Sequence, residues 1–519
     1  MNFTKSSPRL IEKVSSDNAV IGYDLLSILT YMSVLVCGGM GREQILTNCS
    51  RQKLKTAIIF EYIYSMAKYM GVEYTHAFQI VSEKARASRI KSILLRFASA
   101  ISSGESEAEF IDQETRAESN RYMNEYDNSV ENLKKWTDAY AAILVSVTLI
   151  MVVSLVSTMM GNLGEKFIVL MGLVLFSITT IGVYVIYKVA PTENTTYTTG
   201  DGMPIHRRMA RLSLLALAPV GLVSGMLLAS RFDFLIGSAI FFVCVGVSLL
   251  PAAVFAWLDD ARITRLDDMF PMFVRSLGNV AGAANINLIG ALARIDTRSM
   301  GHLEPQIINL RLRLDANLPS DQCWEAFRKE TGSDLVNRGS HMLIDGVTFG
   351  GKADVVGDIS SKFAQGIVQL RAKRRLTSAT FSFLTLPLHA TMVFVLVFVL
   401  QIVATFNTEL SDAYSATGYG SPESVDSIAT NLEIPDQLGV PESGDLAGGI
   451  GFFAVQDLTL VTYTVVMVVL TLTVANSLAP MFASGGSGLK FATFLSPMCL
   501  LSGLILGAVP IITPAIFAI

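Results

Sequence analysis

Seven stretches of about 20 or more residues are mostly apolar and contain no acidic or basic side chain. They lie at residues 140–160, 167–187, 212–230, 234–258, 381–406, 458–478 and 491–519. A helix of about 20 apolar residues spans the roughly 30 Å of hydrocarbon in a bilayer, so this pattern predicts seven transmembrane helices. The first stretch begins far from Met1 and follows a long polar region, so we do not expect a cleaved signal peptide.

The polar regions between these stretches predict the domain organisation of an all-α, polytopic integral membrane protein. We expect an N-terminal polar and helical segment at residues 1–50 and a first helical module at 51–137, followed by four transmembrane helices within 138–258. A second helical module is expected at 259–378, followed by three transmembrane helices within 379–519 with a polar loop at 407–457. Apolar positions recur at helical spacing in both modules, which favours small helical bundles.

The distribution of charge predicts the orientation of the chain in the membrane. The loop after the second apolar stretch carries four basic residues, whereas the loops after the first and third carry only Lys166 and Arg231. Residues 407–457 contain nine acidic residues and no lysine or arginine. Basic residues in short loops stay on the cytoplasmic side. We therefore expect a multi-pass protein of the cell membrane whose two modules and N-terminus lie in the cytoplasm. The acidic loop and the C-terminus are expected outside the cell.

Composition excludes several classes of protein. The chain is 51% hydrophobic and only 16% charged, with a mean hydropathy of +0.48, which excludes an ordinary soluble domain. Five isolated cysteines and five histidines indicate neither a disulfide framework nor a metal site. The net charge of −4 and the lack of a basic, aromatic-rich stripe give no sign of nucleic-acid binding. We expect no cofactor.

Glycines give the two modules a shared order of features. Gly71 and Gly104 interrupt helical patterns in the first module, and Gly282 and the pair Gly350 and Gly351 do so in the second. Because glycine readily adopts the positive φ of a helix end, each position is expected to be a turn. The interval from Gly71 to Gly104 is 33 residues and that from Gly282 to Gly351 is 69, so the second copy is expected to carry an extra helix pair.

A helical bundle with these glycine turns, present twice and each time followed by membrane helices, resembles the F domain of type II secretion and type IV pilus platform proteins. The segments FPMFVRSLGNVAGAANINLIGALARI and FGGKADVVGDISSKFAQGIVQLRAKRR carry most of the resemblance, which covers residues from about 55 to 519. Seven spans and a long acidic outer loop resemble the archaeal branch of this family, which includes the archaellum platform. The first copy departs from the family pattern because it lacks a middle helix pair.

The resemblance implies a membrane platform of an archaeal type IV pilus-like machine. It implies a separate hexameric motor ATPase, pilin or archaellin subunits and a RecA-like companion as partners, together with membrane lipids and a second copy of the chain in a homodimer. The archaellum fits best, and an adhesive pilus or a type II secretion-like system stays open. The platform itself would not be an enzyme.

Other classes of function fit the sequence less well. A membrane transporter needs ionisable groups or broken helices at the midplane, and the spans offer only His389 and a few prolines. We interpret His389 as a hydrogen-bonded interior imidazole. A nucleotide-binding loop would need Ser or Thr after Gly351 and Lys352, where the chain has Ala353. The sequence contains no other arrangement that predicts a catalytic site.

A basic cluster is the clearest candidate contact surface. It comprises Arg371, Lys373, Arg374 and Arg375 just before the fifth span, joined by Arg262, Arg265, Lys134 and Lys135. One interpretation is a topology anchor that meets anionic lipid headgroups. The other is a surface for an acidic face of the ATPase. The carboxylates at positions 259, 260, 267 and 268 are interpreted as solvated charges near a helix start.

Overall fold

The computed structural model describes residues 18–159, 165–198, 203–416 and 458–517, and within them the chain is helical apart from turns, connecting segments and one isolated bridge between Thr196 and Ser333. The N-terminal half contains α2 (Asn18–Cys37), α3 (Arg42–Arg51), α4 (Ala57–Met70), α5 (Tyr74–Lys84), α6 (Ser88–Ser103), α7 (Glu107–Met159), α8 (Glu165–Val189) and α9 (Ile205–Ala229). The remainder contains α10 (Phe234–Ala284), α11 (Leu288–Arg294), η1 (Thr297–Leu303), α12 (Glu304–Asp315), α13 (Ser320–Thr331), α14 (Asp334–Thr348), α15 (Ala353–Ala416), α18 (Thr459–Ser484) and α19 (Lys490–Phe517).

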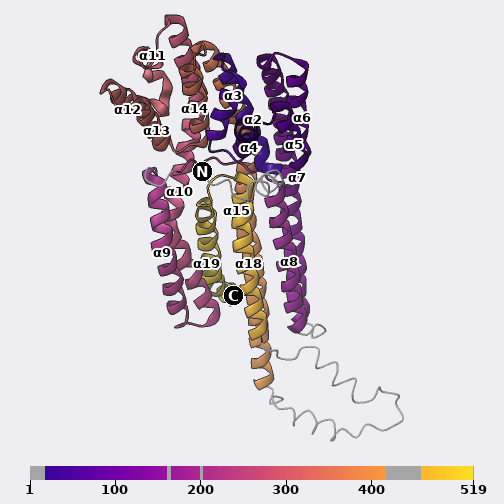
Figure 1. Ribbon diagram of the computed structural model, residues 1–519. Helices are drawn as coiled ribbons and strands as arrows, with labels where there is room; N and C mark the ends of the chain where they lie inside the picture. The colour runs from indigo at the N-terminus through magenta and orange to yellow at the C-terminus, as the bar shows by residue number, and fades with distance from the viewer. Residues whose placement is uncertain (1–17, 160–164, 199–202, 417–457, 518–519) are drawn as a thin grey trace.

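Seven of these helices are long and apolar enough to cross a membrane, which confirms the predicted all-α polytopic membrane fold. They are α7, α8, α9, α10, α15, α18 and α19, and they run side by side (Figure 1). In the most apolar 18-residue stretch of α18, 61% is buried, against only 11% in that of α9. The helix α18 therefore lies inside the helix bundle and α9 at its edge. Most of the acidic loop expected at 407–457 and the C-terminal Ile519 lie outside the described residues.

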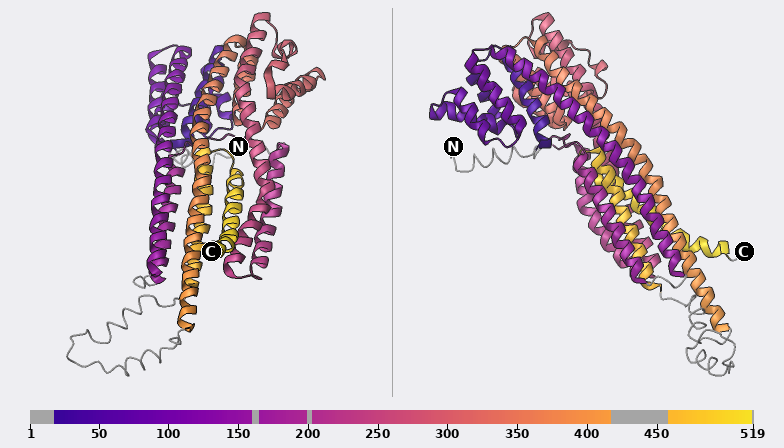
Figure 2. Two further views of the ribbon diagram at one scale, coloured as in Figure 1. Left: turned by 180° about the vertical axis from the view of Figure 1, so that it is seen from behind. Right: turned by 90° about the vertical axis from the view of Figure 1, so that its right-hand side faces the viewer.

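The two polar regions lie at the same end of the membrane helices and share one hydrophobic core (Figures 1 and 2). This core runs from Tyr23 to Val130 and from Leu266 to Leu370. We call these two parts the first and second modules, and together the head. The core shows no boundary near residue 50, because α2 and α3 contribute to it from Tyr23 to Cys49.

The helix α2 is the element that sequence analysis underestimated. Its only charged residue is Asp24, and its side chains from Tyr23 to Leu35 are buried. An apolar helix of this kind needs cover on every side, and α7, α14 and α15 supply it. The N-terminal segment is therefore part of the first module and not a separate polar extension.

Six helices of the first module match six of the second in order, and four of these pairs start at an offset of 246 residues. The matched starts are Arg42 and Leu288, Tyr74 and Ser320, Ser88 and Asp334, and Glu107 and Ala353. The left-handed residues follow the same offset, pairing Gly39 with Asn285, Gly71 with Asn317, and Gly104 with Gly350. The expected extra helix pair in the second copy is therefore wrong: the pair that the first copy seemed to lack is α2 and α3.

Four of the five expected glycine turns are at helix ends, and Gly282 is not. Gly71 and Gly104 end α4 and α6 with φ values of 67° and 71°, while Gly350 has a φ of 96° and directly precedes Gly351 at the start of α15. Gly282 instead lies inside α10, which ends at Ala284 and is capped by Asn285 with a φ of 51°. A Cβ on Gly282 would lie 2.8 Å from Cβ of Asp354, so its small size serves the contact between α10 and α15.

The contact between α10 and α15 brings the two backbones together. A Cβ atom on Gly278 would lie 2.5 Å from the carbonyl oxygen of Ala353 and 2.8 Å from Cα of Gly357. Real Cβ atoms do not approach other atoms this closely, so a larger residue would force the helices apart. Glycine at these positions therefore sets the close crossing of the two long helices.

Within the membrane helices, His389 belongs to a hydrogen-bonded chain, as interpreted from sequence. Its Nε2 lies 2.9 Å from Oγ of Ser502, and its Nδ1 lies 3.1 Å from Nδ2 of Asn476. Tyr140 donates to the side-chain oxygen of Asn476 over 3.2 Å, and Oγ of Ser502 lies 2.8 Å from Oγ1 of Thr473. The chain links α7, α15, α18 and α19, and hydrogen bonds of this kind stabilise helix packing in lipid.

Candidate functional site

Buried charged residues separate the core of the head from the cores of the membrane helices. On α7 the head core ends at Val130 and the membrane core begins at Leu133, and on α15 the corresponding residues are Leu370 and Phe381. We call the charged layer between them the junction. It comprises Glu193, Arg207, Asp259, Asp267, Arg371 and Arg374. Because α7, α10 and α15 pass through this level without a break, the junction connects both parts of the molecule (Figure 2).

Arg371 is the most connected side chain of the junction. Its Nε donates to Oε2 of Glu193 over 3.0 Å, and its Nη1 donates to Oδ2 of Asp267 over 2.7 Å. Its Nη2 donates to the carbonyl oxygen of Asn194 over 3.4 Å. Asp267 also accepts a hydrogen bond from Ser333, whose hydroxyl caps the start of α14. Arg371 therefore joins α15, α10 and the segment between α8 and α9.

Arg374 joins α15 to the end of a membrane helix. Its guanidinium donates to the carbonyl oxygens of Ala483 and Phe482 over 3.0 and 3.1 Å, and to that of Pro191 over 2.7 Å. The last carbonyls of a helix have no partner within that helix, so an arginine placed there satisfies them and also opposes the helix dipole. Gly485 follows with a φ of 65°, and a Cβ there would collide with this guanidinium.

Arg207 fixes the start of α9 against the head. Its Nε donates to Oδ2 of Asp259 over 2.9 Å, and the remaining nitrogens donate to the carbonyl oxygens of Tyr197 and Gly332. Its side chain is 1% exposed. The turn that joins α13 to α14 is thereby held against the first turn of a membrane helix.

Glu193 is the carboxylate that the junction stabilises most clearly. Burial opposes ionisation of Glu193, but the guanidinium groups of Arg371 and Arg374 outweigh burial, and hydrogen bonds from Tyr126 and Arg371 add to them, so the pKa of Glu193 falls below its usual value. Tyr126 on α7 donates to Oε1 of Glu193 over 2.8 Å. Through Glu193 the junction reaches a third long helix.

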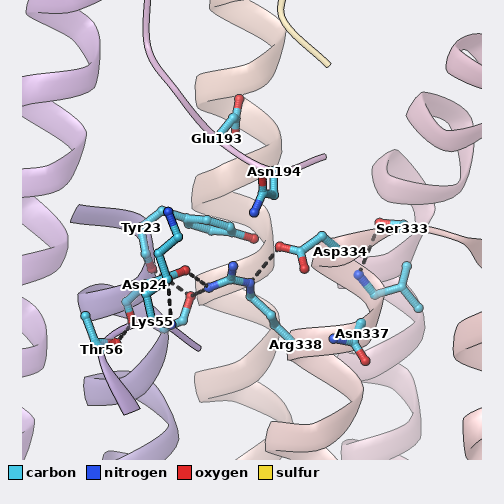
Figure 3. A network of polar contacts seen from close by, with 12 residues as sticks. Tyr23, Asp24, Lys55, Thr56, Glu193, Asn194, Ser333, Asp334, Asn337 and Arg338 are labelled. Carbon is cyan, nitrogen blue, oxygen red and sulfur yellow. Dashed lines mark hydrogen bonds and ion pairs between the residues drawn. The ribbon is translucent and has the colours of Figure 1, made fainter. Parts of the chain in front are cut away.

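A second buried network joins the two modules next to the junction (Figure 3). Arg338 on α14 lies 2.7 Å from Oδ1 of Asp24 on α2, and its Nε donates to Oδ2 of Asp334 over 2.7 Å. Its guanidinium also stacks on the ring of Tyr23, with 4.1 Å from Cζ to the ring centroid. Asp24 in turn accepts a hydrogen bond from the backbone N–H of Lys55 over 3.1 Å. We call this network the module contact.

The arrangement holds the head rigidly on its membrane helices. Each of the buried guanidinium groups of the junction and the module contact has two or more partners, and removing one partner of a buried ion pair costs about 3–5 kcal/mol. These contacts join α10, α15, α18 and the 190–198 segment to one another. The site is suited to transmitting displacement.

The structure corrects the role expected for Arg371 and Arg374. Both side chains are less than 10% exposed and point into the junction, so neither presents a surface to lipid headgroups or to a partner. The reason is their spacing: residues three apart lie on one helix face, and here that face meets α10 and the 190–198 segment. Lys373 and Arg375 point away and are exposed, next to Asp127 and Asp268.

The other expected contact residues are divided in the same way. Lys134, Lys135 and Arg265 are exposed, whereas Arg262 is partly buried and donates to the carbonyl oxygen of Glu330 over 2.5 Å. Lys134 and Lys135 adjoin the exposed Trp136, a residue type that favours the membrane surface. The exposed members of the cluster remain candidates for lipid or partner contact.

The interpretation of the four carboxylates on α10 as solvated helix-start charges is wrong. Asp259 and Asp267 are buried in the middle of a 51-residue helix and pair with Arg207 and Arg371. Their neighbours Asp260 and Asp268 are more exposed and lie near Lys490 and Arg375. Sequence reasoning also missed Glu193, Arg338 and Asp24. A lone carboxylate in an apolar helix, such as Asp24, is the signal that could have revealed a buried partner.

Two curated proteins, both named "Flagella accessory protein J", are similar to the chain. The protein from Methanocaldococcus jannaschii is 22% identical over 323 residues, which is 60% of this chain and 57% of that protein. The protein from Methanococcus voltae is 20% identical over 385 residues, or 72% of this chain and 65% of that protein. The matched regions thus span less than two thirds of either relative. No family model and no solved structure matches the chain.

Proposed function

We propose that the chain is the membrane platform of an archaeal type IV pilus-like machine, and that this machine is an archaellum. The similarity to two proteins named for flagella supports the choice of system. In this proposal a separate hexameric ATPase acts on the head from the cytoplasm, with a RecA-like companion. The platform then moves pilin-like or archaellin subunits from the bilayer into the filament, and it hydrolyses no nucleotide itself.

The single observation that carries the proposal is the continuity of three long helices through a buried ionic layer. The helices α7, α10 and α15 contain 53, 51 and 64 residues and extend from the head into the membrane. A continuous helix transmits tilt or rotation, whereas a flexible linker would absorb it. The junction adds lateral connections, so that a force on either module reaches all three helices.

The topology that the proposal requires agrees with the arrangement of the head. Both modules lie at one end of the membrane helices, which allows one cytoplasmic motor to contact them together (Figure 1). The exposed basic residues Lys134, Lys135, Arg265, Lys373 and Arg375 lie toward the membrane side of the head, where lipid headgroups or a motor could meet them. In this proposal the N-terminus is cytoplasmic and the C-terminus extracellular, and two copies form a dimer.

The test is to interrupt helix continuity between the two cores, after Leu370 and before Phe381 on α15. A flexible Gly-Ser-Gly-Ser insertion after Thr377 is expected to abolish filament assembly in cells that lack the natural copy, while the protein still enters the membrane. The same insertion after Asn317, in an exposed turn of the head, is the control and should leave filaments. Normal filaments from the Thr377 insertion would contradict the proposal.

A milder pair of variants separates flexibility from misfolding. Leu376 and Thr380 are exposed on α15, so replacing both with glycine loosens the helix by about 1 kcal/mol per site relative to alanine without touching the core. We expect the double glycine variant to assemble fewer or slower filaments than the double alanine variant. Equal assembly by the two would count against mechanical coupling.

A further inference from the structure

Arg328 on α13 is a buried arginine without a partner. Its residue surface is 8% exposed, its Nε is buried with no acceptor, and no described residue forms a hydrogen bond or ion pair with its guanidinium. Burial lowers the pKa of Arg328, because its charged guanidinium has lost contact with water. The buried arginines 207, 338, 371 and 374 each have two or more partners. Arg328 therefore differs from every one of them.

A cavity of about 550 Å³ between the two modules provides the space next to Arg328. Tyr31 on α2, Lys53 before α4, and His341 on α14 line it together with Arg328. Pockets that bind small molecules usually have volumes of about 300–1,000 Å³. The cavity also borders Asp334 and Arg338, so an occupant would lie beside the module contact.

None of the four acidic side chains that line the cavity forms an ion pair with Arg328. Three of the acidic side chains around the cavity are already engaged: Asp334 pairs with Arg338, Glu325 pairs with Lys329, and Asp345 accepts the Tyr31 hydroxyl over 2.6 Å. The fourth, Asp321, is exposed in the first turn of α13.

His341 lies in the same cavity as Arg328 and Lys53. Burial, together with Arg328 and Lys53, lowers the pKa of His341 to about 4, although Asp345 lies 3.9 Å from its Nδ1. An added anion would oppose the two cations and raise this pKa.

We propose that this cavity binds a small anionic molecule through a phosphate or carboxylate group held by Arg328, with Lys53 and His341 as further contacts. An anion supplies the acceptors that the guanidinium lacks, and arginine offers such groups two parallel hydrogen bonds. Because helices of both modules line the cavity, the bound molecule would stabilise their contact. The proposal does not depend on the identity of the machine.

Thermal unfolding of the full chain in detergent tests the site, with inorganic pyrophosphate and citrate as probes of the two chemistries. We expect at least one probe to raise the melting temperature in a saturable way, and the more effective probe identifies phosphate or carboxylate. Arg328→Met is expected to weaken binding by at least about tenfold, since a hydrogen bond to a charged group contributes about 1.5–3 kcal/mol. Arg294→Met, an exposed arginine of the same module, should bind normally.

The unliganded Arg328→Met protein distinguishes a ligand site from a structural role. Because Arg328 has no partner, its loss should leave the melting temperature unchanged or higher without probe. The proposal would be overturned if Arg328→Met lost much of its stability without a probe. It would also be overturned if Arg328→Met and Arg294→Met responded equally to the probes, or if the natural sequence responded to neither probe. In the natural sequence, selective histidine labelling offers an independent measurement, because the pKa of His341 should rise above about 4 when the anion binds.

Discussion

Removal of the Arg371 side chain provides the most direct test of the junction. In Arg371→Met the carboxylates of Glu193 and Asp267, 2% and 5% exposed, lose their shared guanidinium. Leaving buried charges unpaired costs about 3–5 kcal/mol. Asp267 also holds the hydroxyl that caps α14, so we expect the second module to open more often than in the natural protein.

Two buried cysteines of the head make this opening measurable. Cys49 and Cys323 are 0% and 1% exposed, so a thiol reagent reaches them only when their module opens. Substituting Cys37 and Cys244 by alanine removes the more accessible thiols. A cost of about 3–5 kcal/mol corresponds to an increase of roughly two to four orders of magnitude in the labelling rate of Cys323.

The matched control is the neighbouring surface pair. Lys373 and Asp127 are 60% and 36% exposed, and exposed pairs contribute about 0–1 kcal/mol, so Lys373→Met should change the labelling rate less than about fivefold. Adding Asp267→Asn to Arg371→Met should recover part of the protection, since Glu193 keeps Arg374 and Tyr126 as partners and Asp267 is the carboxylate left without a cation. If Arg371→Met labels no faster than Lys373→Met, the junction does not stabilise the head and the reasoning fails.

Two further predictions follow from the same structure. Gly278→Ala should destabilise the head by about 1–3 kcal/mol, because the added Cβ would meet the carbonyl oxygen of Ala353. Gly41→Ala is the control and should leave the stability unchanged, because no atom lies within 4 Å of the added Cβ. Thermal unfolding followed by tryptophan fluorescence measures both variants. The ionised Glu193 should stabilise the fold above the usual glutamate pKa of 4.5, and this effect should be lost as the pH falls through the lowered pKa of the folded state. The difference in melting temperature between the natural sequence and Glu193→Gln should therefore shrink below about pH 4.5. A difference that stays constant with pH would contradict the assignment.

The membrane helices were predictable because a long uncharged stretch has one main physical solution in a bilayer. The alignment of one module with the other was not predictable, because a left-handed turn can be made by asparagine as well as by glycine. Asn285 and Asn317 occupy such turns, while Gly282 lies inside a helix. Aligning glycine with glycine therefore shifted one copy against the other and hid α2 within an apparently separate segment.

The site was harder to predict because burial of a charge is decided by partners far away in the chain. Arg371 and Lys373 look alike in a basic run, yet one is enclosed by Glu193 and Asp267 and the other is solvated. The positions of 193 and 267 relative to 371 depend on how the helices pack. Only the sparse charges within apolar surroundings, such as Asp24, offered a local sign.

The constant offset between the modules makes each one a reference for the other. Adding 246 to a residue number in the first module gives the equivalent position in the second, so Ser82 is equivalent to Arg328 and Glu125 to Arg371. Two bundles with the same helix order thus carry different chemistry at equivalent positions. Exchanging the residues at such equivalent positions between the two modules, one position at a time, would show which module performs which task.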